Sequence, residues 1–158
     1  MIIAGTGHRP DKLGGYSENA HNNLVRLAEH WIARNKPRGV ISGMALGWDQ
    51  ALAEASIHAH VPLLAAVPFK GQEIMWPEAS RLRYNQIMSM ASKIEIVSEG
   101  GYAAYKMQIR NEWMVNNSDL LLALWNGSRG GTANCLKYAK SKNREIYNLW
   151  NEFSGALI

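Results

Sequence analysis

The sequence predicts an α/β fold: a single doubly wound, mostly parallel Rossmann-like sheet with helices on both faces. Short apolar runs alternate along the chain with longer segments of helical period, which is the pattern of strand–helix units on a parallel sheet. The chain has 158 residues, enough for one domain with its own core, and contains no repeat, linker or low-complexity tract. We therefore expect residues 1–158 to form one domain.

Each strand is predicted where apolar residues cluster between turn signals. The predicted strands are Met1–Gly5, Gly39–Ser42, Pro62–Pro68, Lys93–Val97, Leu120–Trp125 and, as a weaker edge strand, Glu145–Leu149. The Pro62–Pro68 run is apolar almost throughout, as a strand should be when helices cover both of its faces. Leu120–Trp125 is the most hydrophobic of these runs.

Helices are predicted in the segments between these strands. In the first segment, Ala20, Leu24 and Leu27 recur at the three- and four-residue spacing of a buried helix face. Pro77 suits the first position of a later helix, where its missing N–H is not needed. The expected helices are Ser17–Lys36, Asp49–His60, Glu78–Ala91, Tyr105–Asn117 and a last one that opens at Gly130–Thr132.

In an open parallel sheet, ligands bind beyond the carboxyl ends of the strands, where loops meet helix N-termini. The loops expected there are Gly5–Pro10, Ser42–Asp49, Pro68–Gln72 and Trp125–Thr132. Three of these four loops carry two or more glycines, which let backbone amides approach and cradle an anion. Arg9, Lys70 and Arg129 add positive charge. A tight turn explains any one loop alone, whereas several such loops at one sheet edge favour a phosphate site.

Motif and composition exclude several other classes of protein. The P-loop motif G-x-x-x-x-G-K-[ST] is absent, and Pro10 stands where the dinucleotide fingerprint needs its third glycine. The single cysteine, Cys135, rules out an internal disulfide and any multi-cysteine metal site. The sequence has no apolar run of roughly 20 residues, the length of a membrane span. We therefore expect a cytoplasmic protein with no membrane contact and with neither a metal nor a cofactor.

Two segments in the second half of the chain resemble a known family of enzymes. Arg110–Asp119 reads R-N-E-W-M-V-N-N-S-D and is followed, after an apolar strand, by Gly130–Thr132. This is similar to the R-x-x-x-M … S-D … G-G-x-G-T pattern of the Lonely Guy phosphoribohydrolases, members of the SLOG superfamily of Rossmann-like nucleotide-binding proteins. Gly5–Pro10 and Ser42–Asp49 resemble segments of uncharacterised bacterial and phage SLOG proteins. Together these motifs cover Ile2–Tyr138.

The resemblance implies a phosphate bound over Gly130–Thr132, with Arg110 reaching the sugar–phosphate and Asp49 facing the nucleoside. In the Lonely Guy enzymes the motif continues G-T-x-x-E, and that glutamate helps to cleave an N-glycosidic bond. Cys135 stands at the corresponding place here. The predicted catalytic residues are Arg110 and Asp49. The predicted ligand-binding residues are Gly5, Thr6, Gly7, His8, Arg9, Ser42, Gly43, Met44, Gly47, Gly127, Gly130, Gly131 and Thr132.

Several of these residues have a structural interpretation beside the functional one. Arg110 is either a solvated helix charge or a phosphate ligand, and its spacing to Met114 and Asp119 favours the ligand. Asp49 can cap the helix that it opens, contact the ligand, or do both. Glu112 is two residues from Arg110 and therefore lies on a different helix face, so we interpret it as structural.

Other residues near the predicted site have weaker functional interpretations. Cys135 lies in the first turn of its helix, where a thiolate can be stabilised, but a lone cysteine there is more often a small buried hydrophobe. For His8, a ligand contact and a role in loop structure stay equally open. Glu54, five residues after Asp49, is a weaker candidate for a catalytic acid. Core packing is expected for the three tryptophans near loop ends, although one of them can stack on a base: Trp48, Trp76 and Trp125.

Two functions are consistent with this sequence. The first is an enzyme that hydrolyses the N-glycosidic bond of a nucleoside 5′-monophosphate, with Asp49 as the carboxylate near the sugar. The second is a non-catalytic module that binds or senses a nucleotide-derived signal, which Cys135 favours. Nucleic acid is not an expected partner, because 17 basic against 13 acidic residues give a net charge of only +4 without a basic stripe. The resemblance also implies that two copies can pair as a homodimer.

Overall fold

The computed structural model describes residues 1–155 and contains one six-stranded sheet in which every strand pair is parallel. The order of the strands across the sheet is β4-β3-β2-β1-β5-β6. The prediction of a mostly parallel Rossmann-like sheet is therefore confirmed. The strands are β1 (Ile2–Gly7), β2 (Gly39–Ser42), β3 (Leu63–Val67), β4 (Lys93–Ile96), β5 (Leu120–Leu124) and β6 (Glu145–Asn148).

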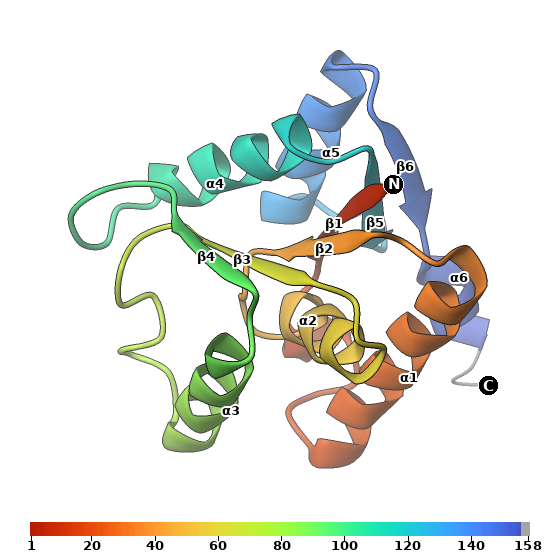
Figure 1. Cartoon of the computed structure of the whole chain (residues 1–158), viewed down its shortest axis with the longest axis horizontal. Coiled ribbons are helices and arrows are strands. Elements are labelled where there is room, and N and C mark those ends of the chain that lie inside the picture. Colours follow the sequence, from red (N-terminus) through yellow and green to blue (C-terminus); the bar gives the residue numbers. More distant parts are fainter. Residues whose placement is uncertain (156–158) are drawn as a thin grey trace.

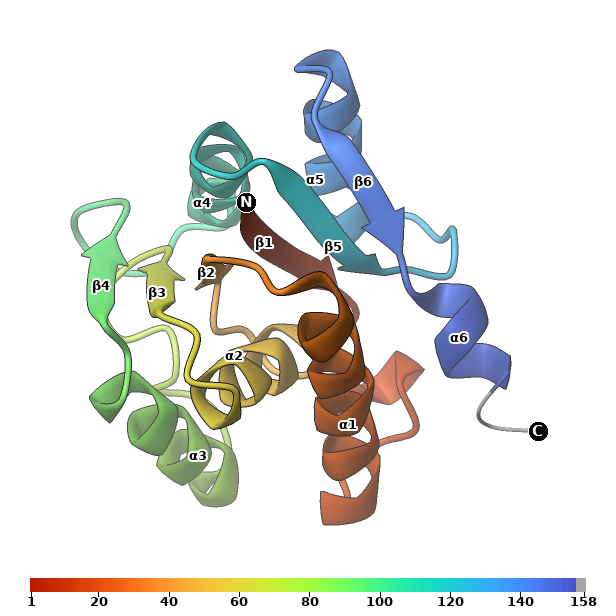
Figure 2. The ribbon, with the colours of Figure 1, turned by 45° about the vertical axis from the view of Figure 1, so that its right-hand side comes forward.

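Helices cover both faces of this sheet, with α1, α2 and α3 on one face and α4 and α5 on the other (Figures 1 and 2). The short helix α6, which follows β6, is not predicted by the sequence pattern. In the part of the chain that the structure describes, no helix is both long and apolar enough to cross a membrane. The helices are η1 (Pro10–Lys12, a 3₁₀ turn), α1 (Glu18–Asn35), α2 (Trp48–His58), α3 (Glu78–Ser89), α4 (Tyr105–Asn116), α5 (Gly131–Ser141) and α6 (Trp150–Gly155).

Each helix layer has its own hydrophobic core, because successive side chains of a strand point to opposite faces of the sheet. In β5, Leu120, Leu122 and Leu124 pack in the core on the side of α1–α3. Leu121 and Ala123 pack in the core on the side of α4 and α5. All of β5 is buried, which explains why its sequence is the most hydrophobic run in the chain.

β1 extends to Gly7, beyond the predicted strand end at Gly5. The extension belongs to the ladder with β5, where Thr6 aligns with Ala123 and Gly7 aligns with Leu124. The end of β1 therefore lies further along the chain than the sequence predicts, and it carries Thr6 and Gly7 to the edge of the sheet.

The helix starts agree with the capping signals to within a residue. Ser17 is the N-cap of α1, and its hydroxyl accepts the N–H of Ala20 at 3.1 Å. Pro77 is the N-cap of α3 rather than its first helical residue, because its ψ of 151° is extended. The prediction for Pro77 is thus wrong by one position.

The strand order has a switch point between β1 and β5. The chain adds β2, β3 and β4 to one side of β1 and then crosses back to add β5 and β6 on the other side. The helix that follows β1 and the helix that follows β5 lie on opposite faces of the sheet (Figure 1). Sheets of this kind bind ligands at the point where the loops after two neighbouring strands run to opposite faces of the sheet. The fold therefore directs a ligand site to the carboxyl ends of β1 and β5.

Candidate functional site

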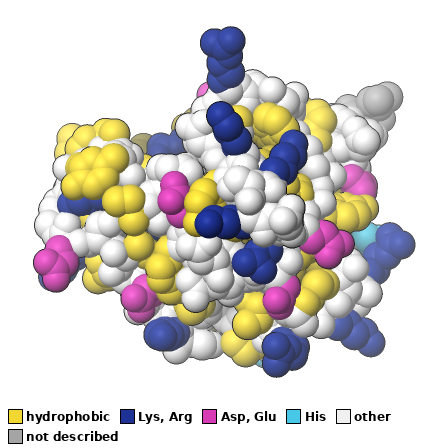
Figure 3. Space-filling view, turned by 90° about the horizontal axis from the view of Figure 1, so that it is seen from above, with side chains coloured by type: hydrophobic (Ala, Val, Ile, Leu, Met, Phe, Trp, Pro, Cys, Tyr) yellow, Lys and Arg dark blue, Asp and Glu magenta, His cyan; other side chains and the backbone are white. Residues whose placement is uncertain are grey.

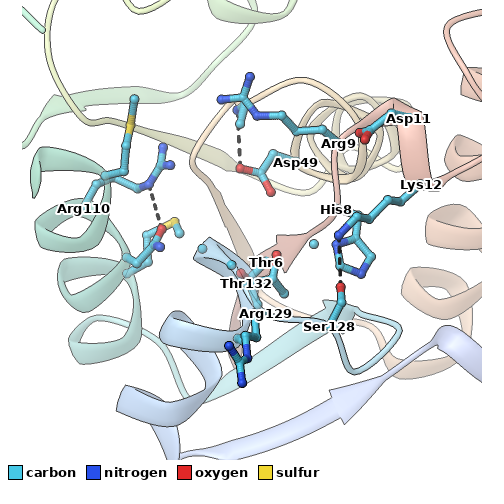
Figure 4. A pocket seen from close by; sticks show the side chains of 18 of the residues that line it. Thr6, His8, Arg9, Asp11, Lys12, Asp49, Arg110, Ser128, Arg129 and Thr132 are labelled. Atoms are coloured by element: carbon cyan, nitrogen blue, oxygen red, sulfur yellow. Dashed lines mark hydrogen bonds between the residues drawn. The ribbon is translucent and has the colours of Figure 1, made fainter. Parts of the chain in front are cut away.

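A cavity of about 380 Å³ opens at this switch point. Its walls come from the loops after β1, β2, β3 and β5 and from one face of α4 (Figure 4). The structure thus brings Arg110 and the Gly130–Thr132 turn to one cavity. The lining residues are Thr6, Gly7, His8, Arg9, Asp11, Lys12, Ala45, Asp49, Gln72, Met107, Arg110, Asn111, Met114, Ser128, Arg129, Gly130, Gly131, Thr132 and Ala133.

The N-terminus of α5 is open to this cavity. Its N-cap is Gly130, with φ of 142°, and no side chain caps the helix there. The first intrahelical hydrogen bond runs from the N–H of Asn134 to the carbonyl of Gly130 at 3.0 Å. The amides of Gly131, Thr132 and Ala133 therefore have no intrahelical partner. Since a Cβ at Gly130 or Gly131 would meet nothing within 4 Å, this wall of the cavity is suited to receive an anion.

Three basic side chains from two loops add positive charge to the same region: Arg9, Lys12 and Arg129. Lys12 Nζ donates to the hydroxyl of Ser128 at 3.0 Å, so it connects the η1 turn to the loop before α5. Lys70, which the sequence also suggested, is exposed and does not line the cavity. Lys12 and Arg129 thus belong to the side of the α5 amides, whereas the guanidinium of Arg9 lies on the side of Asp49 (Figure 4).

The loop after β5 is held in place by hydrogen bonds that begin at His8. The backbone N–H of Asn126 donates to Nε2 of His8 at 3.0 Å. Nε2 also lies 2.9 Å from Oδ1 of Asn126, and burial lowers the pKa of His8 against the opposing effect of that contact. The side chain of Asn126 accepts the N–H of Ser128 at 2.9 Å, and Trp125 Nε1 donates to the Ser128 carbonyl at 2.7 Å. His8 thus supports the loop while also lining the cavity.

Arg110 is a buried structural arginine as well as a lining residue. Its side chain is only 5 % exposed. Nη1 donates to the carbonyls of Gly43 at 2.6 Å and Ala66 at 3.4 Å, and Nε donates to Asn111 Oδ1 at 3.0 Å. A Cβ at Gly43 would lie 2.4 Å from Nη1, so glycine at this position makes room for the guanidinium. Arg110 therefore joins α4 to the ends of β2 and β3.

Asp49 lies in the first turn of α2 and faces the cavity from the wall opposite Thr6 and Thr132 (Figure 4). Its Oδ2 accepts the N–H of Ala45 at 3.3 Å, so the carboxylate takes part in the loop that precedes its helix. Burial raises the pKa of Asp49 to about 6, and the nearby charges of Arg110 and Arg9 oppose that shift. Asp49 therefore both supports this loop and lines the cavity.

Six of the predicted ligand-binding residues do not line the cavity: Gly5, Ser42, Gly43, Met44, Gly47 and Gly127. Gly5 lies inside β1, where a Cβ would be 2.5 Å from the side chain of Leu52. Gly47 has φ of 94°, and a Cβ there would lie 2.5 Å from the carbonyl oxygen of His8. Met44 is fully buried with φ of 62°. Gly5, Met44 and Gly47 thus have a role in chain packing, whereas a Cβ at Gly127 would meet nothing within 4 Å.

Sequence reasoning did not single out five polar residues of the site: Asp11, Lys12, Gln72, Asn111 and Ser128. Gln72 Nε2 donates to the Gly43 carbonyl at 3.2 Å, so it shares an acceptor with Arg110. For Asn111 a signal was present in the sequence. The α4 residues that line the cavity, which are Met107, Arg110, Asn111 and Met114, follow the three- and four-residue spacing of one helix face.

The remaining candidates lie outside the cavity. Glu54 pairs with His21 of α1 at 3.1 Å, and Glu112 accepts a bond from Gln108 one turn away. Cys135 is fully buried in the core beneath α4 and α5, and burial raises its pKa to about 11. Cys135 is therefore a small buried hydrophobe, as expected from the sequence. The tryptophans Trp48, Trp76 and Trp125 do not line the cavity either.

The parallel strand order and the cavity at its switch point define a doubly wound, Rossmann-like protein with a candidate ligand site at the carboxyl edge of its sheet. Within this class, the chain belongs to the YspA SLOG family (YpsA), whose model matches residues 3–151. The SLOG resemblance of the sequence motifs is thereby confirmed.

Proteins similar in sequence come from bacteria and a prophage. The uncharacterized SPbeta prophage-derived protein YoqJ of Bacillus subtilis is 32 % identical over 145 residues, covering 82 % of this chain and 84 % of that protein. A UPF0398 protein of Halalkalibacterium halodurans is 30 % identical over 158 residues, covering 91 % of this chain and 82 % of that protein.

Solved structures with low sequence identity share the fold. DNA processing protein A from Streptococcus pneumoniae matches 93 % of this chain with a TM-score of 0.66 and 16 % identity, but the match spans only 49 % of that protein. DNA processing protein A from Helicobacter pylori, described with a single-stranded DNA binding mode, gives a TM-score of 0.66 and 16 % identity over 94 % of this chain and 64 % of that one. A molybdenum cofactor binding protein from Rippkaea orientalis gives 0.61 and 15 % identity over 93 % of this chain and 74 % of that one.

Proposed function

We propose that the cavity binds a nucleotide or a nucleotide-derived phosphate ligand, with the phosphate at the N-terminus of α5. The observation that carries the proposal is the uncapped first turn of α5 in a cavity that also holds Arg9, Lys12 and Arg129. Free backbone amides, the helix dipole and nearby cations together form a site for a phosphate group. The neighbours named for a molybdenum cofactor and for single-stranded DNA support the same class, since both of those ligands carry phosphate.

The opposite wall of the cavity is suited to the uncharged part of such a ligand. Asp49 repels a phosphate, so it favours a ligand whose negative charge stays at α5. Met107 and Met114 offer an apolar surface that can adapt to a ring, and Gln72 and Asn111 offer amides. The cavity is thus polarised, with an anion end and a nucleoside end.

A small ligand agrees with the size of the cavity. On the face covered by α4 and α5, Lys and Arg side chains gather in a band, with Asp and Glu at its sides (Figure 3). The cavity volume of about 380 Å³ lies at the small end of the range for ligand pockets.

Isothermal titration tests the proposal with inorganic phosphate, a ribonucleoside 5′-monophosphate, the matching nucleoside and a short single-stranded oligodeoxynucleotide. We expect the monophosphate to bind about tenfold or more tightly than the nucleoside, because a charge-assisted phosphate contact contributes about 1.5–3 kcal/mol. Lys12→Met should weaken the binding of the monophosphate. Lys137→Met makes the same charge change at an exposed α5 position outside the cavity and should leave this binding unchanged. Equal affinity for nucleoside and monophosphate would contradict the proposal.

Hydrolysis of the N-glycosidic bond of a nucleoside 5′-monophosphate is a second candidate, and the observation that favours it is the carboxyl group of Asp49 in the cavity. In this reaction water adds to C1′ as the C1′–N bond breaks, and the products are ribose 5-phosphate and the free base, which takes up a proton. A carboxylate stabilises the positive charge that develops on the sugar. Chromatography of free base tests it: we expect Asp49→Asn to abolish release. Binding without release over a panel of monophosphates would leave a non-catalytic binding or sensing module.

A further inference from the structure

The carboxylate of Asp49 accepts fewer hydrogen bonds within the protein than it can. Its side chain is buried, with the residue only 6 % exposed. Among residues 1–155, its one side-chain hydrogen bond is the long contact of 3.3 Å from the N–H of Ala45. The nearby guanidinium of Arg110 donates to Gly43, Ala66 and Asn111 rather than to Asp49. An ionised carboxylate accepts up to about four hydrogen bonds, so this group faces the cavity with unused capacity.

A ligand in the cavity can supply further donors, because Asp49 lines the cavity and its carboxylate has room for more hydrogen bonds. A fully ionised phosphate supplies none, since it is an anionic acceptor and is repelled by Asp49. Hydroxyl groups can supply them. In a nucleotide the sugar lies next to the phosphate, and a ribose presents two neighbouring hydroxyls, which match the two oxygens of one carboxylate.

We propose that Asp49 selects ligands whose sugar carries a free 2′-hydroxyl, so that the cavity takes ribose phosphates in preference to 2′-deoxyribose phosphates. This inference rests on the proposed function, because it assumes a phosphate at α5. The position of Asp49 across the cavity from Thr132 suits it, since the two walls then hold the two ends of one sugar phosphate (Figure 4). A deoxyribose leaves one carboxylate oxygen without its donor, and the site discriminates against it for that reason.

Ribose 5-phosphate and 2-deoxyribose 5-phosphate are the sharpest probes, because they differ in the one hydroxyl and carry no base. Isothermal titration of the full chain at neutral pH should give a preference of about 10- to 150-fold for ribose 5-phosphate, the range for one hydrogen bond to a charged group. Asp49→Asn should reduce this preference to a few-fold. Glu54→Gln removes the same charge from the same helix outside the cavity and should leave the preference unchanged.

The outcomes separate this inference from the proposed function. Equal binding of the two sugar phosphates overturns the selection by the 2′-hydroxyl and leaves the phosphate site intact. A preference that survives Asp49→Asn overturns the assignment to Asp49. Absence of binding by both sugars and by inorganic phosphate overturns the phosphate site and the inference with it. If Asp49→Asn does not fold, as judged by circular dichroism, the ratio measured with the unmodified chain remains the test.

Discussion

The two walls of the cavity are built in opposite ways. On the α5 wall, Gly130 and Gly131 leave open space and the first-turn amides have no partner in the helix. On the wall formed by the β2–α2 loop and α4, Arg110 is buried and donates to three protein acceptors, and the loop glycines touch neighbouring atoms. The α5 wall is therefore prepared for a ligand, whereas the other wall is mainly held together by its own contacts.

This contrast shows that loop glycines can serve two purposes. They can make room for neighbouring protein atoms, or they can leave space for a ligand. Gly43 has no room for a Cβ because the guanidinium of Arg110 lies against it. Gly47 has no room for one because the backbone of His8 lies against it. Gly131 has no such neighbour. The same residue types thus support packing on one wall and ligand access on the other, and substitutions can tell the two apart.

The largest effect is expected from Arg110→Met. Removal of the guanidinium takes away a donor to the carbonyls of Gly43 and Ala66 and a positive charge near Asp49, which should lower the free energy of unfolding by about 3–5 kcal/mol. Urea denaturation measures this change. Arg129→Met, on the open wall, should change stability by less than about 0.5 kcal/mol. Similar stability for the two variants would remove the distinction between the walls.

The second effect comes from a matched pair of glycine substitutions. Gly47→Ala should lower the free energy of unfolding by about 2–4 kcal/mol, because it combines a left-handed φ with a clash against the His8 carbonyl. Gly131→Ala should change the free energy of unfolding by no more than about 1 kcal/mol. It should also weaken the binding of inorganic phosphate, because the added methyl group enters the cavity. Unfolding and phosphate titrations are measured on both. Unchanged phosphate binding in Gly131→Ala would show that the open space at α5 is not the anion site.

The third effect concerns pH. Ribose hydroxyls donate to ionised Asp49, whose pKa is about 6, so the preference for ribose 5-phosphate should be full above that pH. Below it the ionised fraction falls about tenfold per pH unit, and the preference should shrink accordingly. The phosphate titrates near the same pH, but identically in both sugars, so their affinity ratio isolates Asp49. The charged groups that act on the pKa of Asp49 are Arg110 and Arg9. A ratio that does not change with pH would contradict the role of Asp49.

The smallest effect is expected from Cys135→Ala. The thiol is fully buried beneath the cavity and does not line it, so its removal should cost about 1 kcal/mol of stability and leave phosphate binding unchanged. Denaturant unfolding and phosphate titration provide the measurements. A loss of binding would place Cys135 in the site after all.

The sequence predicts the fold well because each signal is local. The apolar runs and the helical spacing locate all six strands and the first five α-helices. The pairing that extends β1 to Gly7 depends on β5, more than a hundred residues away, and so could not be read from the run itself. For the same reason the position of Arg110 was predictable from its motif, but its bond to Gly43, 67 residues away, was not. The single domain, the homodimer and the cytoplasmic location stay predictions.

The extension of β1 also bears on how tightly a ligand can be held. Thr6 and Gly7 line the cavity while they belong to the β1–β5 ladder, so the floor is fixed by sheet pairing before any ligand arrives. Association then requires little ordering of the backbone beneath the ligand, and more of the interaction energy remains as affinity. Ordering is confined to the long exposed side chains at the rim, such as Lys12 and Arg129.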